Sequence, residues 1–293
     1  MYRDFTVEIE YLHPLQVSSI MHFSRQEMEK RQPWLRIVAI LFFCAAFVFT
    51  VFIDAPDEFM EKIRWLGSAI CHQLPSHSFH LNDQQFPLCS RCTGTYLSAL
   101  LGLAFFITRG RRTGIPKKAI LILFVFFFLV WAIDGSNSFF YEVLQQQLLY
   151  QPSNTIRFLS GIGMGMVFSL IIMTIVNIVL WEKSESVALL KDWKEVGFLF
   201  LCESVLILFP YNKSAFLFNL AGIASVTTAL VLIGLLYTIL LVILTHQEGT
   251  FLTMRGALPV LCFGFGIALF QFSFMANLRM RTLFSIFPYM INK

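Results

Sequence analysis

The sequence predicts an all-α, polytopic helical membrane protein with about seven transmembrane helices and one amphipathic helix in an outward loop. Of its 293 residues, 57% are hydrophobic and only 14% are charged, whereas soluble domains carry about 25% charged residues. Several apolar runs are long enough to cross a bilayer, which takes roughly 20 residues. Because lipid offers the backbone no hydrogen-bond partners, runs of this kind predict helices.

The apolar runs divide the chain into three parts. The third run is short and the fifth includes polar flanks, so six or eight spans also fit. We expect a cytoplasmic N-terminal tail (1–33), a motif-bearing domain (34–181) with an outward Cys/His loop (54–92), and a three-helix C-terminal extension (182–293). The runs cover residues 35–53, 93–108, 119–133, 159–181, 190–210, 219–245 and 257–274.

Basic residues predict the orientation of the chain in the membrane. The densest group lies between the second and third runs, which makes that connection cytoplasmic and the Cys/His loop outward. The net charge of +4 is ordinary for such a protein and predicts no nucleic-acid partner. The lipid bilayer is the only partner that the sequence indicates. The basic group consists of Arg109, Arg111, Arg112, Lys117 and Lys118.

The Cys/His loop opens with a predicted amphipathic helix. Asp54 and Asp57 place acids at its first turn, where the helix dipole favours them. Four apolar residues then recur at helical spacing and define one face. We expect this helix to lie on the outer membrane surface and to end near Gln73, before Pro75. The apolar face consists of Phe59, Ile63, Leu66 and Ile70.

The strongest functional signal is the clustering of cysteine and histidine between Cys71 and Cys92. This stretch holds three of the six cysteines and three of the six histidines. A Cys-x-x-Cys pair with further ligands about 20 residues upstream is typical of a zinc site. We therefore predict zinc as the cofactor, with His77 or His80 as alternatives for the histidine ligand. The predicted ligands are Cys71, His72, Cys89 and Cys92.

The same cysteines allow two other interpretations. Cys89 and Cys92 flank Arg91, which would favour a thiolate, so the pair fits a thiol–disulfide oxidoreductase to which Cys71 relays electrons. A structural disulfide between Cys71 and one of the other two thiols would pin the loop. The sequence leaves metal binding, redox exchange and a structural disulfide open.

Polar residues at the ends of the third and fourth runs are candidates for chemistry. Asp134 ends the third run and Arg157 opens the fourth, so they pair or share an outward pocket. Asp134 would act as a further ligand or a general base, and Arg157 as an anion clamp. Gln73, Arg91 and Asn154 would line the same pocket. The alternative is a helix-capping acid and an arginine that snorkels to lipid headgroups.

Glu203 is the only acid well inside an apolar run. A carboxyl group in lipid is a candidate for a proton or ion path, which supports a proton-coupled transporter as another function. In the alternative interpretation, Glu203 is protonated and hydrogen-bonded to Asn219 or Gln271. Gly161 and Gly165 form a Gly-x-x-x-Gly step that predicts close packing of the fourth run against a neighbour.

Two segments of the Cys/His loop resemble a family signature: Cys71-His72-Gln73-x-Pro75-x-x-Ser78-Phe79 and Pro87-Leu88-Cys89-x-Arg91-Cys92-Thr93-Gly94-x-Tyr96. They are similar to a widespread family of predicted bacterial and archaeal membrane proteins, a domain of unknown function. Asp134-Gly135 and Asn154-x-x-Arg157-x-x-x-Gly161 resemble its later motif. The family pattern has arginine in place of His77, which favours His72 as the ligand.

The resemblance implies a multi-pass protein of a bacterial inner or archaeal cell membrane, and it names no reaction. The sequence also contains no phosphate-binding glycine loop, zinc-protease motif or nucleophile elbow. The leading hypothesis is an outward zinc site beside an Asp/Arg pocket, serving a metal-dependent enzyme on a lipid-linked substrate. A thiol–disulfide oxidoreductase and a proton-coupled transporter are the alternatives.

Overall fold

The computed structural model describes residues 33–52, 55–144, 146–147 and 149–286, with side chains omitted at 33–36, 50–52 and 283–286. The predicted tail (1–33) and the loop start at Asp54 therefore lie almost wholly outside the described residues. The helices are α2 (Pro33–Phe52), α3 (Phe59–Gly67), α4 (Ser90–Ile107), α5 (Lys118–Leu144), α6 (Asn154–Leu180), α7 (Trp193–Ser204), α8 (Ala215–Leu244) and α9 (Met254–Ile286). Two 3₁₀ segments, η2 (Pro75–His77) and η3 (Val205–Tyr211), and four strands complete the chain: β1 (Ser78–Leu81), β2 (Gln84–Cys89), β3 (Arg112–Gly114) and β4 (Glu185–Ala188).

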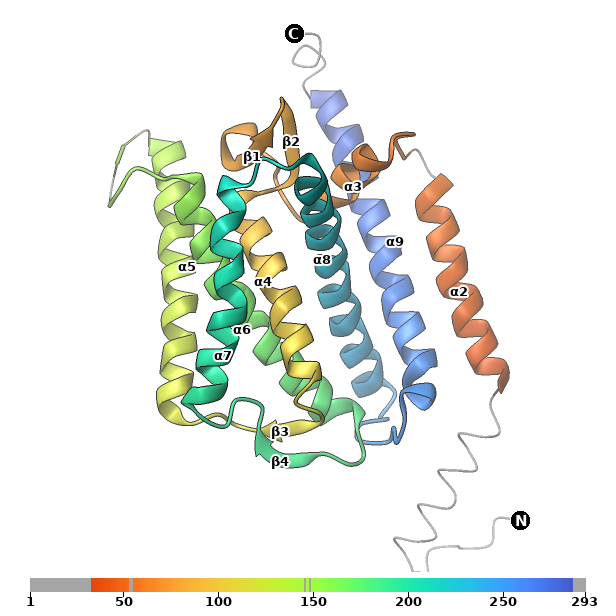
Figure 1. Cartoon of the computed structure of the whole chain (residues 1–293). Helices are drawn as coiled ribbons and strands as arrows, with labels where there is room; N and C mark the ends of the chain where they lie inside the picture. The colour runs from red at the N-terminus through yellow and green to blue at the C-terminus, as the bar shows by residue number, and fades with distance from the viewer. Residues whose placement is uncertain (1–32, 53–54, 145, 148, 287–293) are drawn as a thin grey trace, which may run out of the picture.

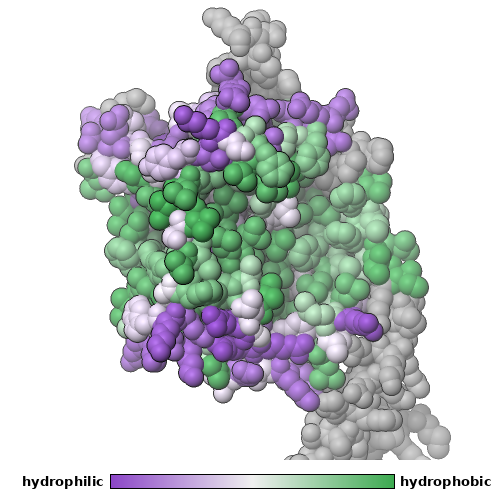
Figure 2. Space-filling view, in the orientation of Figure 1, coloured by the Kyte–Doolittle hydropathy of each residue, from purple (hydrophilic) through white to green (hydrophobic). Residues whose placement is uncertain are grey.

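The long helices run side by side along one axis, which confirms the predicted helical membrane class (Figure 1). Among the described residues, α4, α5, α6, α8 and α9 are long and apolar enough to cross a membrane. The two remaining predicted spans correspond to α2, with an apolar segment at Ile37–Phe49, and to α7 continued by η3. The count of seven stays a prediction. Figure 2 shows a broad apolar belt between two polar ends, as a bilayer requires.

Helix α6 lies at the centre of the bundle, where its backbone contacts that of α4. In the most apolar window of α6, 72% of the residues are buried, against 17% in α5. A Cβ atom on Gly161 would lie 2.2 Å from the Arg91 carbonyl oxygen, and one on Gly94 would lie 2.2 Å from the Phe158 carbonyl oxygen. The predicted close packing of the fourth run is thus confirmed, and α4 is the helix that it packs against.

The Cys/His loop folds as a short helix followed by a β-hairpin at one end of the bundle (Figure 1). Helix α3 ends at Gly67, earlier than predicted, and it buries Ile63 and Trp65 while Phe59 stays exposed. Strands β1 and β2 pair antiparallel around Asn82 and Asp83, whose φ angles are +48° and +62°. Such a turn favours Asn and Asp. The sequence analysis had predicted no hairpin here.

A cluster of phenylalanine rings fixes the hairpin to the bundle. Phe86 of β2 meets Phe218 of α8, with ring centroids 5.0 Å apart, and Phe79 of β1 meets Phe158 of α6 at 5.5 Å. Phe209 of η3 contacts rings from both strands. Edge-to-face contacts of this kind add to the burial of apolar area. The loop is therefore held in a defined position above the helices.

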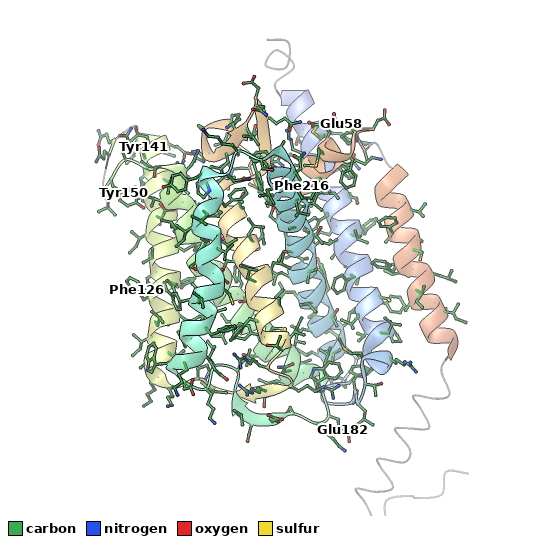
Figure 3. The ribbon with its side chains drawn as sticks, viewed as in Figure 1. Glu58, Phe126, Tyr141, Tyr150, Glu182 and Phe216 are labelled. Atoms are coloured by element: carbon green, nitrogen blue, oxygen red, sulfur yellow. The ribbon has the colours of Figure 1, made fainter. Side chains whose placement is uncertain are left out.

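Basic residues gather at the opposite end, around the parallel pair β3–β4. Arg109 and Arg112 both contact Glu195, at 3.4 Å and 3.0 Å, and Arg111 covers the Trp181 ring. Figure 3 shows Glu182 at this end, whereas Tyr141, Tyr150 and Glu58 lie at the hairpin end. The two ends thus carry different polar groups, with the apolar belt between them.

Candidate metal centre and polar network

Three cysteines that are separated in sequence meet beneath the hairpin. The sulfur atoms of Cys71, Cys89 and Cys92 all lie within 4.8 Å of one another. Cys71 follows α3, Cys89 ends β2, and Cys92 lies in the first turn of α4. All three are free thiols, and the first two are buried while Cys92 is partly exposed. We call this group the sulfur cluster.

Hydrogen bonds within the sulfur cluster favour a thiolate at Cys71. The backbone N–H of Cys89 donates to the Cys71 sulfur at 3.1 Å. Hydrogen bonds from the thiols of Cys89 and Cys92, and then this backbone N–H, lower the pKa of Cys71 well below its usual value. Hydrogen bonding to Cys71 and burial raise the pKa of Cys89. A thiolate is the form of cysteine that binds metal ions.

The structure does not bring His72 into the sulfur cluster. His72 is exposed, and its Nε2 atom faces the Nδ1 atom of His77 at 2.9 Å. His77 is buried beside Arg157, with 3.1 Å between its Nε2 atom and Nη2, and it contacts Glu142 at 2.6 Å. Burial, followed by the positive charge of Arg157, lowers the pKa of His77 to about 4. His80 is exposed on β1.

Gln73 shapes the loop around the cysteines. Its φ angle is +53°, in the left-handed region, and this turns the chain directly after His72. Its side-chain amide donates to the carbonyl oxygens of Arg64 and Pro87, both at 2.7 Å. Both amide protons are therefore used to join α3 to β2. Gln73 acts here as a structural tie, whereas the sequence had suggested a pocket residue.

Arg279 of α9 holds the backbone next to the first cysteine. Its guanidinium donates to the Ser68 carbonyl oxygen at 2.9 Å and to the carbonyl oxygens of Cys71 and His72. These carbonyl groups follow the end of α3, where they have no helical partners. The sequence analysis missed this contact, because residues more than 200 positions apart give no local signal.

Asp134 pairs directly with Arg91, and Arg157, with which it was predicted to pair or to share a pocket, lies in the same hydrogen-bonded group. Helix α5 continues to Leu144, so Asp134 lies inside the helix and not at its end as predicted. Its Oδ2 atom accepts from Nε of Arg91 at 2.9 Å and from Nη2 at 2.6 Å. Tyr150 donates to Oδ1 at 2.6 Å, and Ser160 donates to Oδ2 at 2.9 Å. The carboxylate is 1% exposed and fully engaged.

Arg157 belongs to the same group of hydrogen bonds through Ser138. The Ser138 hydroxyl oxygen accepts from Arg91 at 3.1 Å and from Arg157 at 3.4 Å. Arg157 also donates to the Asn154 side chain at 3.1 Å, and Asn154 in turn donates to the carbonyl oxygens of Ser76 and Ser78 at 3.2 Å. We call this group the polar network: Arg91, Asp134, Ser138, Tyr150, Asn154, Arg157 and Ser160.

Sequence spacing carries a signal for part of the polar network. Ser138 lies four residues after Asp134 and Ser160 three residues after Arg157, which places each pair on one helix face. Tyr150 comes from the connection between α5 and α6 and has no such signal. The network joins α4, α5, α6 and the hairpin, so it fixes the helix that carries Cys92.

Glu203 belongs to neither group. It lies in the last turn of α7, it is 3% exposed, and neither carboxyl oxygen has a hydrogen-bond partner among the described residues. Gln271, one of the two partners predicted for Glu203, accepts a hydrogen bond from Tyr237 at 2.8 Å.

Comparisons with known proteins place the motif-bearing segment among uncharacterised membrane proteins. A family described as a predicted membrane protein (DUF2085) matches residues 71–171. An uncharacterized protein of Methanocaldococcus jannaschii is 32% identical over 100 residues, which are 33% of this chain and 58% of the relative's length. An uncharacterized protein of Methanothermobacter thermautotrophicus is 33% identical over 98 residues, or 33% of this chain and 78% of the relative. No solved structure matches the chain.

Proposed function

The chain belongs to the DUF2085 family of predicted membrane proteins, and we propose that it binds one metal ion, with zinc as the first candidate, through Cys71, Cys89 and Cys92. The observation that carries this proposal is the convergence of three free sulfur atoms within 4.8 Å of one another. All three residues lie in the segment that the family shares.

The dimensions of the sulfur cluster suit a thiolate-bound ion. With Zn–S distances near 2.3 Å, tetrahedral geometry separates two sulfur ligands by about 3.8 Å. A span of at most 4.8 Å accommodates this separation, and none of the three cysteines is disulfide-bonded. The sulfur at Cys71 already accepts a backbone N–H, which stabilises the charged form that an ion requires.

Three sulfur donors leave room for a fourth ligand. Catalytic zinc sites combine three protein ligands with a water or substrate, whereas structural sites fill all four positions with protein. When bound, a zinc ion would supply Lewis-acid chemistry at the surface of the apolar belt, where a lipid-linked or amphipathic substrate can reach it. Both oxygens of Asp134 accept hydrogen bonds, so its contribution to the site is to hold Arg91 and α4 in place.

The proposal also includes the side of the membrane that the sulfur cluster faces. The basic residues around β3–β4 lie at the end opposite the sulfur cluster, and the excess of basic residues on cytoplasmic loops supports an outward sulfur cluster in a bacterial or archaeal cell membrane. Outward compartments of bacteria are oxidising, and thiols persist there when a metal ion or a redox partner protects them.

Metal content of the purified full-length protein in detergent tests the proposal. Elemental mass spectrometry should find about one zinc ion per chain, and Cys71→Ser, Cys89→Ser and Cys92→Ser should each lower that content. Cys202→Ser is the matched control, because Cys202 is a free thiol on α7 outside the sulfur cluster. Metal retained in a variant that carries all three substitutions, or no metal in the wild-type protein, would overturn the proposal.

The oxidoreductase alternative gives a different result in the same preparation. It predicts no metal, thiols that appear only after reduction, and a mixed disulfide at Cys89 in the Cys92→Ser variant. A metal site predicts thiols that appear after chelation and no trapped partner.

A further inference from the structure

We propose that Glu203 is a proton-binding site in the apolar interior of the bundle, separate from the sulfur cluster. Its carboxyl group is 3% exposed and has no hydrogen-bond partner among the described residues. An ionised carboxylate without partners in an apolar medium is very costly, and the group becomes neutral instead. The side chains around Glu203 therefore have to accommodate a proton on its carboxyl group.

The first of these side chains is Ser98 of α4. Its hydroxyl group faces Glu203, but it donates its only proton to the Ile162 carbonyl oxygen at 2.8 Å. What Ser98 presents to Glu203 is therefore an oxygen lone pair, which can accept a hydrogen bond and cannot donate one. A protonated Glu203 could donate a hydrogen bond to this oxygen.

In the part of the chain that the structure describes, no charged group on the neighbouring elements pairs with Glu203. From Phe158 to its end, α6 has no ionisable side chain, and the only one in η3 is the exposed Tyr211. On α4 the ionisable residues, which are Arg91, Cys92 and Tyr96, precede Ser98 on the hairpin side, and Arg91 is bound to Asp134. On α5 the acids Asp134 and Glu142 interact with Arg91 and His77. On α7 itself Glu195 pairs with Arg112 at the opposite end.

The position of Glu203 in its helix is the second independent observation. Two residues further on, at Val205, the α-helix changes to the 3₁₀ segment η3, which contains Pro210. A 3₁₀ stretch within a spanning segment often marks a hinge. Interrupted helices also place ion-binding groups near the midplane in transporters. A proton that enters or leaves Glu203 would therefore act directly on a discontinuity of the α7–η3 segment.

A proton fits this site better than a metal cation. Hard cations take about six oxygen ligands, and among the described residues Ser98 is the one hydroxyl group that faces the carboxyl. The Glu203 carbonyl oxygen already accepts the Val205 N–H at the helix end. A single carboxyl group beside one acceptor oxygen is sufficient for a proton.

Infrared spectroscopy of the full-length protein in lipid nanodiscs tests the proposal. A protonated carboxyl group has a C=O stretching band that is separate from the carboxylate bands. We expect this band in the wild type at neutral pH and its loss in Glu203→Gln, whose amide has nearly the same shape. Glu195→Gln is the control, because Glu195 is paired with arginine and should contribute no such band.

Carbodiimide labelling of the wild type gives a second readout that needs no variant. A lipid-soluble carbodiimide takes the carboxyl proton on one nitrogen and bonds the carboxyl oxygen to its central carbon. The acyl group then migrates to nitrogen, and nothing leaves. Peptide mass spectrometry should find the adduct at Glu203 and not at Glu195. A wild-type spectrum without the band, or one whose band persists in Glu203→Gln, would overturn the proposal. Unchanged zinc content in Glu203→Gln would show that the two sites are independent.

Discussion

The sulfur cluster and the polar network share one turn of chain, yet they differ in how far their polar atoms are satisfied. Arg91 stands between Cys89 and Cys92 in sequence. In the network, both oxygens of Asp134 accept hydrogen bonds, and Arg91 and Arg157 meet at the Ser138 hydroxyl. In the cluster, the backbone N–H of Cys89 donates to the Cys71 sulfur, and the three sulfur atoms lie within 4.8 Å of one another.

This difference separates a group that holds helices together from a group that can take a ligand. A fully satisfied buried network fixes a unique arrangement, and removing one member leaves its partners unpaired. Soft sulfur atoms with unused lone pairs retain the capacity to bind an ion. The network and the glycine contacts between α4 and α6 thus position Cys92, and the cluster is the proposed ligand site.

Asp134→Ala should cause the largest loss of stability, because it leaves the Arg91 guanidinium partly buried without its counter-charge. Breaking one partner of a buried ion pair costs about 3–5 kcal/mol. The free energy of unfolding in detergent measures the effect. Glu61→Ala is the control, since Glu61 and Arg64 form a partly exposed pair on α3, and it should change stability by no more than about 1 kcal/mol. Equal small effects would mean that the polar network is not structural.

Gly161→Val should separate α4 from α6. The new Cβ atom would lie 2.2 Å from the Arg91 carbonyl oxygen, and such overpacking costs about 1–3 kcal/mol. Because α4 carries Cys92, zinc affinity should fall together with stability. Gly197→Val on α7 is the matched control, because nothing lies within 4 Å of its new Cβ atom. Normal zinc binding in Gly161→Val would show that the sulfur cluster does not depend on the helix contact.

Tyr150→Phe should have a smaller effect. It removes the hydrogen bond from the phenol to Asp134 and leaves three other donor contacts to that carboxylate, from Arg91 and Ser160. A loss of about 1 kcal/mol is expected, and thermal unfolding in detergent would detect it. Zinc content should stay unchanged, since Tyr150 does not contact the sulfur cluster. Loss of zinc in this variant would contradict the division into two groups.

The smallest expected effect is a pH dependence at the alkaline end. Burial, followed by the hydrogen bond to Asp134, raises the pKa of Tyr150 to about 12. A raised pKa in the folded state stabilises the protein below the unfolded pKa of about 10, and this contribution is lost as pH rises towards 12. The wild type should therefore lose more stability than Tyr150→Phe between pH 10 and pH 12. Parallel unfolding curves for the two proteins would argue against the Tyr150–Asp134 contact.

Local patterns predicted the helices and the convergence of the cysteines. Long apolar runs are sufficient to identify α4, α6, α8 and α9. The Cys-x-x-Cys spacing and an upstream Cys71 were sufficient to expect three sulfur atoms together. The prediction of His72 as a fourth ligand finds no support in the geometry, because the left-handed turn at Gln73 places the His72 ring beside His77.

Long-range contacts account for the features that the sequence did not reveal. The run Gly135-Ser136-Asn137 resembles a helix end, but α5 continues through it because Asp134, Asn137 and Ser138 find partners on other elements. The partner of Asp134 is Arg91, 43 positions away in the sequence, so no local pattern indicated this pair. The hairpin had a local signal in Asn82-Asp83 between alternating residues, and the sequence analysis did not use it.

The number of sulfur ligands on the bound ion tests the central claim most directly. X-ray absorption at the zinc edge of the purified full-length protein should show three sulfur neighbours near 2.3 Å. In Cys71→Ser the number should fall to two or the zinc should be lost, while Cys202→Ser should keep all three. A zinc ion surrounded only by nitrogen and oxygen would contradict the account, because it would place the ion away from Cys71, Cys89 and Cys92.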